Sequence, residues 1–311
     1  MRRFVEQSVI TSLVPRLKRS LIKEPPLRHN APFVRASVAA VFRWKETEQQ
    51  SLELLFVRRS VNKNDIWSGQ IAFPGGRRQK KTQMDLKLPD SVSDERTDDW
   101  ESLRETAQRE TFEEVGLDLT TKHVHWIGNL SPIESQLIPL SVSTQVYFID
   151  TAADEHNYKP KVQTSEIADV FWVDVQELYN PQRYNVLSYP IEDALLSLRL
   201  HPRVLAMIKK VLGNMLFDCI YLPRPNRSPP DEECLPRDMH DFVLWGLTLR
   251  AVVMICAAAD APLPIRLKPR HFDSKLIGDV VLYCLQYSDK IIAGTATLSI
   301  LFMFGLVYSN L

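Results

Sequence analysis

The fold is decided by residues 109–117, RETFEEVGL, which we expect to end a helix that begins near Asp99. Within this helix Glu110, Glu113 and Glu114 are three and four residues apart, so their carboxylates project from one face. Like charges at these spacings destabilise a helix unless a cation lies among them. On their own the three carboxylates also fit a solvated acidic face. Because clustered carboxylate oxygens are hard ligands, the alternative is a site for Mg²⁺ or Mn²⁺.

A pair of glycines upstream favours the metal site. Gly75 and Gly76 close the apolar run 70–74, QIAFP, which reads as a strand that ends in a tight turn. The strand, the turn and the helix would together bring a glycine backbone beside the acidic face.

These features resemble the box of the Nudix hydrolase family, in which a Gly and a Glu precede Arg-Glu-x-x-Glu-Glu-x-Gly. The matching residues are Gly76, Glu101, Arg109, Glu110, Glu113, Glu114, Gly116 and Leu117. The family places five residues between the Gly and the first Glu, whereas residues 77–100 stand there in this chain, an insertion of about nineteen. The inserted segment is polar and turn-prone, so we expect it to loop out without moving the helix.

The resemblance implies an α/β fold, a Nudix-type α/β/α sandwich with a mixed sheet, and hydrolysis of a phosphoanhydride bond. It implies that Mg²⁺ or Mn²⁺ is held by four residues, Glu110, Glu113, Glu114 and the backbone carbonyl of Gly76. It also implies catalytic roles for Glu110, Glu113, Glu101 and Arg109, with a box glutamate as the candidate general base.

Arg109 is expected to pair with Glu101 and to hold the helix against the diglycine, because a buried acid without its partner would be costly. Family members often use a further Glu from outside the box. Glu134 and Glu166 are the two candidates here, and we expect each to be an ordinary surface carboxylate.

The stretch before the box narrows the predicted substrate. Residues 54–60, LLFVRRS, and 67–76, WSGQIAFPGG, are similar to the signature of coenzyme A pyrophosphatases within the family. The candidate substrate-binding residues are Arg58, Arg59, Ser60, Gly69 and Phe73. Asp65 stands where the signature has Arg, and an aspartate cannot bind a phosphate bidentately, so Arg58, Arg59 and Lys63 are the cations expected to compensate.

The predicted reaction is therefore hydrolysis of coenzyme A or its acyl derivatives to adenosine 3',5'-bisphosphate and a 4'-phosphopantetheine product. Two alternatives stay open. One is another Nudix hydrolase of a nucleoside diphosphate linked to a second group, such as ADP-ribose, a nucleotide sugar or a dinucleoside polyphosphate. The other is a catalytically silent, membrane-tethered protein that binds a nucleotide, against which the intact glutamates argue.

Composition argues against a nucleic-acid partner, a structural zinc site and a disulfide framework. The 38 basic and 38 acidic residues balance, so no nucleic-acid partner is expected. The four cysteines form no Cys-x-x-Cys pair, so we predict neither a structural zinc nor a disulfide framework, and we expect a reducing compartment. The oligomeric state stays open.

We divide the chain into four predicted segments. Residues 1–31 form a basic amphipathic extension, for which a packed helix, a mitochondrial presequence and a membrane-surface helix are the alternatives. Residues 32–259 form the Nudix hydrolase domain, with its insertion at about 77–100. Residues 260–290 form a linker or helix, and residues 291–308 form the last segment.

Residues 291–308 predict a C-terminal hydrophobic helix that acts as a transmembrane anchor. The segment has 18 residues and no charged side chain. At 1.5 Å per residue it would span roughly 27 Å, close to a hydrocarbon core of about 30 Å. A buried or peripheral helix is the alternative. We therefore expect a membrane-associated protein, with the mitochondrion and the peroxisome as candidate organelles and a soluble intracellular protein as the alternative.

Overall fold

The computed structural model describes residues 5–22, 34–45, 51–62, 67–81, 100–135, 139–150, 162, 165–195, 201–223, 242–268 and 271–273. The chain divides into two compact units, which we describe separately. The first unit comprises Met1–Ser135, Pro139–Asn185 and Cys219–Arg266. The second unit comprises Gln136–Ile138, Val186–Asp218 and Leu267–Leu311.

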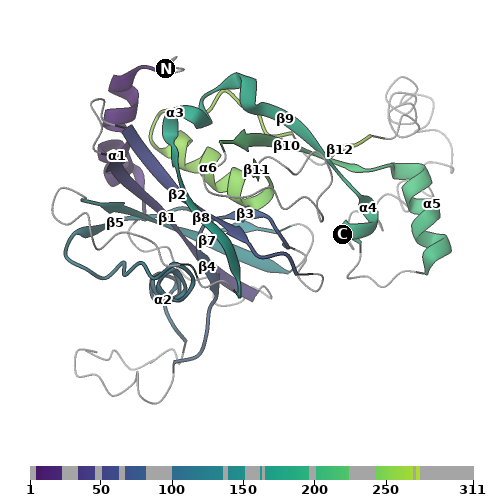
Figure 1. Cartoon of the computed structure of the whole chain (residues 1–311), viewed down its shortest axis with the longest axis horizontal. Coiled ribbons are helices and arrows are strands. Elements are labelled where there is room, and N and C mark those ends of the chain that lie inside the picture. The colour runs from purple at the N-terminus through teal and green to yellow at the C-terminus, as the bar shows by residue number, and fades with distance from the viewer. Residues whose placement is uncertain are drawn as a thin grey trace, which may run out of the picture. The chain divides into compact units, whose positions relative to one another are not determined.

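A mixed sheet forms the centre of the first unit (Figure 1). Within the described residues it has eight strands, with the path β3-β2-β1-β7-β5, while β4, β6 and β8 pair with β1, β7 and β2. Their bounds are β1 (Val34–Lys45), β2 (Ser51–Arg59), β3 (Ile71–Ala72), β4 (Gly75–Arg77), β5 (Val124–Asn129), β6 (Ile133–Glu134), β7 (Leu140–Ile149) and β8 (Ile167–Asp174). β1 and β7 run parallel, and β1 is antiparallel to β2 and β4. This arrangement confirms the predicted α/β fold with a mixed sheet.

Helix α2 (Leu103–Val115) carries the acidic face and begins and ends at clear signals. The Ser102 hydroxyl accepts a hydrogen bond from the Glu105 N–H at 3.1 Å, and the Glu105 carboxylate accepts one from the Ser102 N–H at 2.6 Å. Gly116 ends the helix in the left-handed conformation, with φ of 66°. The predicted start near Asp99 is too early, because this capping box fixes the first turn at Leu103.

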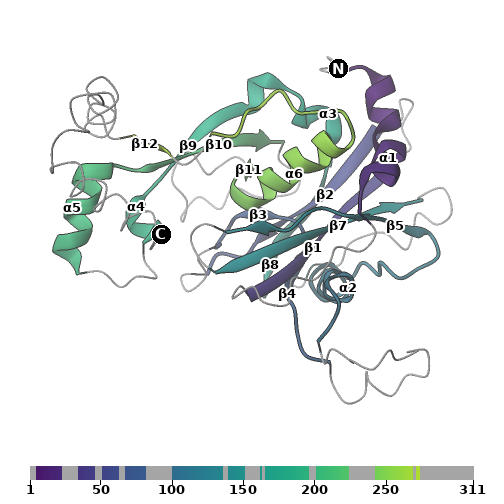
Figure 2. The same cartoon turned by 180° about the vertical axis from the view of Figure 1, so that it is seen from behind.

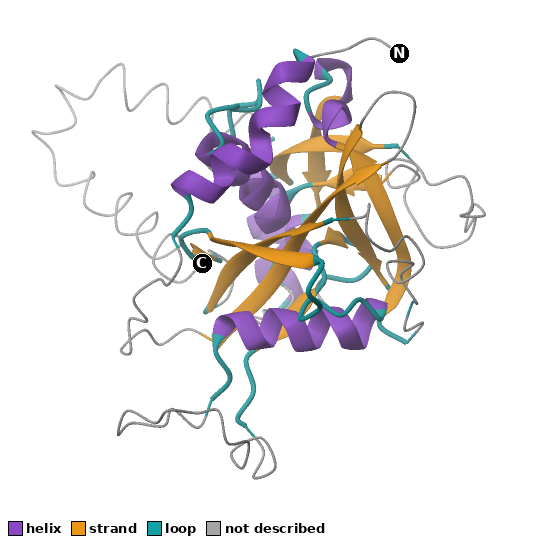
Figure 3. Ribbon diagram, turned by 90° about the vertical axis from the view of Figure 1, so that its left-hand side faces the viewer, coloured by secondary structure: helices purple, strands orange, loops and turns teal. Residues whose placement is uncertain are grey.

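The buried side of α2 packs on the sheet. Ala107 and Val115 from the helix join one hydrophobic cluster with side chains from four strands, Ala39, Val41, Leu55, Val57, Val124, Tyr147 and Ile149. Figure 3 shows α2 along one face of the strands, with the other large helices of the first unit on the opposite side. The predicted sandwich of helix, sheet and helix is therefore present in this unit.

Helices α1 (Gln7–Ser20) and α6 (Gly246–Ala258) lie on that opposite side (Figure 2). In α1 the apolar side chains of Ile10, Leu13, Val14 and Leu17 are buried. Arg16 donates through Nη1 to the carbonyls of Ala259 and Asp260, at 3.4 and 3.2 Å, just after α6 ends. A cation at a helix C-terminus satisfies its last carbonyls and its dipole. The structure thus shows a packed helix within the N-terminal extension, while the presequence and the membrane-surface helix stay predictions.

Short elements complete the chain. They are α3 (Val175–Leu178), the 3-10 helix η3 (Pro181–Arg183), β9 (Tyr184–Tyr189), α4 (Ile191–Ala194), α5 (Pro202–Leu212), β10 (Met215–Leu222), β11 (Phe242–Leu244) and β12 (His271–Phe272). In the second unit, Ile191, Leu195, Leu212 and Met215 form a small buried cluster. The sequence pattern of residues 195–215 predicts one helix, but this is wrong at its end, because Gly213 terminates α5 with φ of 70° and β10 begins at Met215.

The predicted C-terminal helix at 291–308 lies outside the described residues. Across the ranges that the structure does describe, none of the helices has both the length and the apolar character that a membrane crossing requires.

Candidate active site

The diglycine lies directly against the acidic face of α2. The Gly75 N–H donates to Glu114 Oε2 at 2.9 Å. A Cβ atom added to Gly76 would overlap the carboxylate of Glu110, so only glycine leaves room for that side chain. β4 holds both glycines in place, because Gly76 pairs with Ser37 of β1. The predicted juxtaposition of diglycine and carboxylates is therefore present.

The base of the insertion explains why its length does not disturb this contact. The Glu101 N–H donates to the Gln79 carbonyl at 3.0 Å, and the Gln79 N–H donates to Glu101 Oε2 at 3.2 Å. Lys80 and Trp100 form an antiparallel bridge, and Arg78 donates through Nε to the Glu101 carbonyl. The chain thus leaves and returns at one place, as expected for a segment that loops out.

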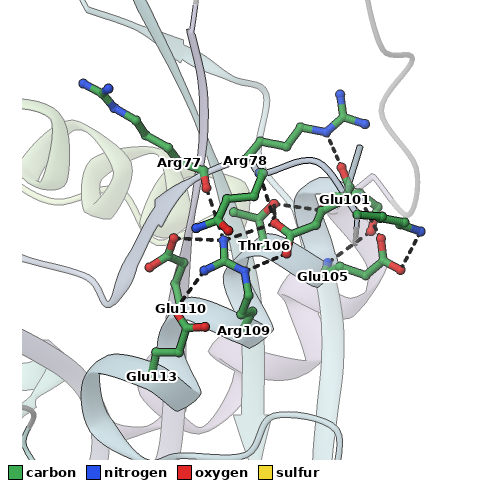
Figure 4. A network of polar contacts seen from close by, with 11 residues as sticks. Arg77, Arg78, Glu101, Glu105, Thr106, Arg109, Glu110 and Glu113 are labelled. Atoms are coloured by element: carbon green, nitrogen blue, oxygen red, sulfur yellow. Dashed lines mark hydrogen bonds and ion pairs between the residues drawn. The ribbon is translucent and has the colours of Figure 1, made fainter. Parts of the chain in front are cut away.

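Arg109 is the hub of the polar network in Figure 4. Its Nε lies 2.6 Å from Glu101 Oε1, and its Nη2 donates to Glu101 Oε2 at 3.1 Å and to the Arg77 carbonyl at 3.2 Å. Nη2 also lies 2.9 Å from Glu110 Oε1, and Nη1 lies 2.9 Å from Glu113 Oε2. The predicted pair with Glu101 is confirmed. Arg109 therefore ties α2 both to the base of the insertion and to the strand of the diglycine.

Glu101 stays ionised in this network. Burial alone would raise its pKa, but hydrogen bonds from Arg109 and from the Gln79 N–H outweigh burial and hold the pKa below its usual range. The Thr106 hydroxyl, 3.1 Å from Glu101 Oε2, adds to this stabilisation of the charge. Because its oxygens are taken up by Arg109, Gln79 and Thr106, Glu101 is a positioning residue.

Glu114 and Glu110 have the opposite electrostatic environment. Burial is the main cause that raises the pKa of Glu114 to about 7, with the charges of Glu110 and Glu166 acting in the same direction and the Gly75 N–H and Arg59 opposing it. Burial also raises the pKa of Glu110, opposed by Arg109 and reinforced by Glu113 and Glu166. These carboxylates repel one another in a partly dry site, where an additional cation would be stabilised.

Glu166, one of the two candidate glutamates outside the box, lies closer to the box carboxylates than an ordinary surface carboxylate would. It precedes β8 and is exposed, as expected, yet its charge acts on both Glu110 and Glu114. The Ser60 N–H donates to the Glu166 carbonyl at 2.8 Å, which fixes its backbone at the end of β2. Two features of the sequence pointed to Glu166, the family's frequent use of a Glu from outside the box and its place just before β8. Glu134 lies in β6, which pairs with β7.

The carboxylates do not form a ready-made metal site. Among the described residues, no three or more His, Cys, Asp or Glu side chains are gathered as metal ligands would be. Glu110 and Glu113 are instead paired with Arg109, and Glu114 accepts from Gly75. The donors nevertheless suit Mg²⁺ or Mn²⁺, because they are hard oxygens in a partly buried site, where burial first and the neighbouring carboxylates second raise the pKa of Glu110 and Glu114. The metal site stays a prediction.

The predicted substrate-binding residues lie in different surroundings. The charge of Arg59 acts on Glu114, and Ser60 contacts the backbone of Glu166, so both lie beside the acidic cluster. Arg58 instead places its guanidinium carbon 5.6 Å from the centre of the Phe242 ring.

Two further candidates shape the backbone and the core. Gly69 adopts φ of 69° in the turn before β3, a conformation that favours glycine. Phe73 is 3% exposed and stacks on Phe56 with ring centres 5.2 Å apart. Phe73 therefore packs in the core, and direct contact with a substrate stays a prediction for both residues.

Comparison with known proteins places this site in a family. A family model described as the NUDIX domain matches residues 34–194. An uncharacterized protein of Schizosaccharomyces pombe is 28% identical over 218 residues, an alignment that spans 64% of this chain and 58% of that relative.

A C. elegans Ap4A hydrolase binary complex is 16% identical and aligns over 46% of this chain and 82% of its own, with a TM-score of 0.30. The NUDIX domain of Shewanella oneidensis NrtR, complexed with ADP ribose, is 19% identical and aligns over 50% of this chain and 80% of its own, with a TM-score of 0.29. Since the family model covers just over half of the chain and includes the diglycine and α2, this protein belongs to the Nudix family.

Proposed function

We propose that this protein is a divalent-metal-dependent hydrolase of the phosphoanhydride bond in a nucleoside diphosphate that is linked to a second group. Membership of the Nudix family supports this reaction. The observation that carries the proposal is the contact between the diglycine and α2, in which the Gly75 N–H meets Glu114 and Gly76 makes room for Glu110.

The residues that would hold Mg²⁺ or Mn²⁺ are Glu110, Glu113, Glu114 and the Gly76 carbonyl. When bound there, such an ion would neutralise the oxygens of a pyrophosphate and lower the pKa of a coordinated water. Burial is the main cause of the raised pKa values of Glu110 and Glu114, and the neighbouring carboxylates add to it; a cation would offset both effects, which supports this assignment.

The chain's own residues would position the substrate and move the proton. Arg59 provides a positive charge beside Glu114, which suits the phosphate groups of a nucleotide. Glu166 is exposed and acts electrostatically on the box carboxylates, so it is our candidate to accept the proton of the attacking water. Arg109 and Glu101 would keep α2 and the diglycine in register.

Coenzyme A and its acyl derivatives are the substrates that we propose, with adenosine 3',5'-bisphosphate and a 4'-phosphopantetheine product. Support comes from residues 54–60 and 67–76, which are similar to the coenzyme A pyrophosphatase signature. ADP-ribose, nucleotide sugars and dinucleoside polyphosphates are the alternative substrates. We also retain the proposal that residues 291–308 attach the protein to a membrane, because they contain no charged side chain.

The test is a substrate screen with the full chain in Mg²⁺, in which chromatography resolves the nucleotide products. We expect coenzyme A to be cleaved faster than ADP-ribose or a dinucleoside polyphosphate. Glu114→Gln should lower the turnover by at least about a hundredfold. The matched control is Glu134→Gln, which removes an exposed carboxylate from β6 and should leave turnover unchanged. Unchanged turnover in a folded Glu114→Gln variant would refute the assignment of the site.

A further inference from the structure

Helix α5 exposes a ridge of apolar side chains. Val204 is 41% exposed, Met207 is 61% exposed and Val211 is 40% exposed. They are three and four residues apart, so they lie along one side of the helix, within an arc of about 60°. Ridges of this kind on small units are uncommon unless another surface covers them.

The described part of the second unit does not cover this ridge. Leu205, Ile208 and Leu212 lie on the adjacent side of α5, about 100° round the helix from the ridge, and pack with Ile191 and Met215 in the cluster of that unit. Figures 1 and 2 both show α5 next to α4, the helix that carries Ile191. The helix therefore has one broad apolar face, of which the inward part packs in the cluster and the ridge is the exposed part.

The charges on α5 identify the kind of surface that would cover the ridge. The helix contains Arg203, Lys209 and Lys210 and no acidic residue. Lys209 is paired with Glu192 of α4. On a helical projection Arg203 and Lys210 fall beside Met207, along the outer edge of the ridge. An apolar strip bordered by cations is the pattern of a helix that lies in the interface of an anionic membrane.

We propose that the Val204, Met207 and Val211 ridge of α5 docks on the surface of a bilayer that contains anionic lipids. The three apolar side chains enter the acyl boundary, and Arg203 and Lys210 contact the headgroups. Residues 291–308 belong to the same unit and carry no charged side chain, so a lipid surface is a consistent occupant for both parts of it. The proposal adds a docking surface to the proposed membrane attachment and does not depend on the hydrolase activity.

The first test is co-sedimentation of the full chain with extruded vesicles of phosphatidylcholine, with and without phosphatidylserine. Met207→Glu should lower the partition coefficient between vesicles and solution about tenfold. The variant places a charge where the Met207 thioether would enter the acyl boundary of the bilayer. The matched control is Val186→Glu, which adds the same charge at a 42% exposed apolar position of β9 in the same unit. It should change the partition coefficient less than twofold, and neither variant should change hydrolysis.

The charge contribution is tested with Lys210→Glu. This variant should weaken binding to the phosphatidylserine vesicles about fivefold or more, with little effect on vesicles of phosphatidylcholine alone. The matched control is Lys122→Glu, which reverses an exposed cation in the first unit and should bind as the parent does.

A second measurement uses the unmodified chain. It reports on Met207 itself, so it does not depend on how strongly residues 291–308 bind the vesicles. Met207 is exposed whereas Met215 is 3% exposed, so peroxide should oxidise Met207 faster in solution. Phosphatidylserine vesicles should slow the oxidation of Met207 several-fold relative to added free methionine, as read by mass spectrometry. Equal oxidation rates with and without vesicles would overturn the proposal. So would a Met207→Glu variant that changes the oligomeric state without lipid, since a second copy would then be the occupant.

Discussion

The ion pair between Arg109 and Glu101 should couple the insertion to α2 by a measurable free energy. The pair has two contacts, at 2.6 and 3.1 Å, and the side chains are 22% and 13% exposed. A bidentate, charge-assisted pair of this kind contributes more than a surface salt bridge, but residual solvent screens it, so we expect a coupling of about 1 to 2 kcal/mol.

A double-mutant cycle measures this coupling directly. Arg109→Met keeps most of the length of the side chain, and Glu101→Gln keeps its shape, so each variant removes mainly the ion pair. Because both single variants lose the same ion pair, the free energy of unfolding in urea should fall in the double variant by less than the sum of the two single changes. Arg109→Met combined with Glu53→Gln is the matched control, because Glu53 is ion-paired with Arg43 and not with Arg109. The control pair should add within about 0.5 kcal/mol.

The same pair predicts a dependence on pH. The folded-state pKa of Glu101 lies below its ordinary value of 4.5, so its contribution is complete above that pH and is lost as the pH falls through the folded-state pKa. The stability difference between the parent and Glu101→Gln should therefore be constant near neutrality and shrink in acid. Additive single changes, or a difference that grows in acid, would refute the assigned role of Arg109.

Three other predictions concern the packing around the site. Leu13→Ala should lower the free energy of unfolding by about 2 to 5 kcal/mol, since Leu13 is 0% exposed. The control Lys18→Ala, at an exposed position of the same helix, should change it by less than about 0.5 kcal/mol. Similar urea midpoints for the two variants would show that the packing of α1 does not stabilise the fold. Gly76→Ala should lower hydrolysis at least about tenfold by displacing the Glu110 carboxylate, and parent-like turnover would contradict that contact. Replacing residues 82–99 by a short Gly-containing turn should change the free energy of unfolding by less than about 1 kcal/mol and leave hydrolysis unchanged, because Lys80 and Trp100 already bridge the flanking backbone. Loss of hydrolysis in a folded variant would show that the segment has a role in the reaction.

Local signals in the sequence predicted most of the first unit. The composition of residues 140–149, rich in Val, Thr, Tyr, Phe and Ile, predicts a strand, and β7 has these bounds. The spacing of the glutamates placed all three on α2, and the polar composition of the insertion correctly indicated that it would not displace the diglycine. These features follow from residues that are close in the chain or from one short motif.

The errors concern contacts between distant segments and two boundaries, one of which is the start of α2, predicted four residues too early. Glu166 comes close to the box only because β8 pairs with β2, where Arg59 lies opposite Ile167, and no local pattern reports that pairing. The helix predicted over residues 195–215 continued too far, because the apolar pattern runs past Gly213 into β10. The engagement of Glu110 and Glu113 by Arg109 likewise depends on side-chain geometry that the sequence does not contain.

The contact between α1 and α6 bears on when the protein can fold during its synthesis. Arg16 reaches the carbonyls of Ala259 and Asp260, which the ribosome adds more than two hundred residues later. Until those residues leave the exit tunnel, this side of α1 has no final partner, and its buried leucines need temporary cover. A nascent chain halted at Asn185 should consequently recruit holding chaperones that the released chain no longer needs.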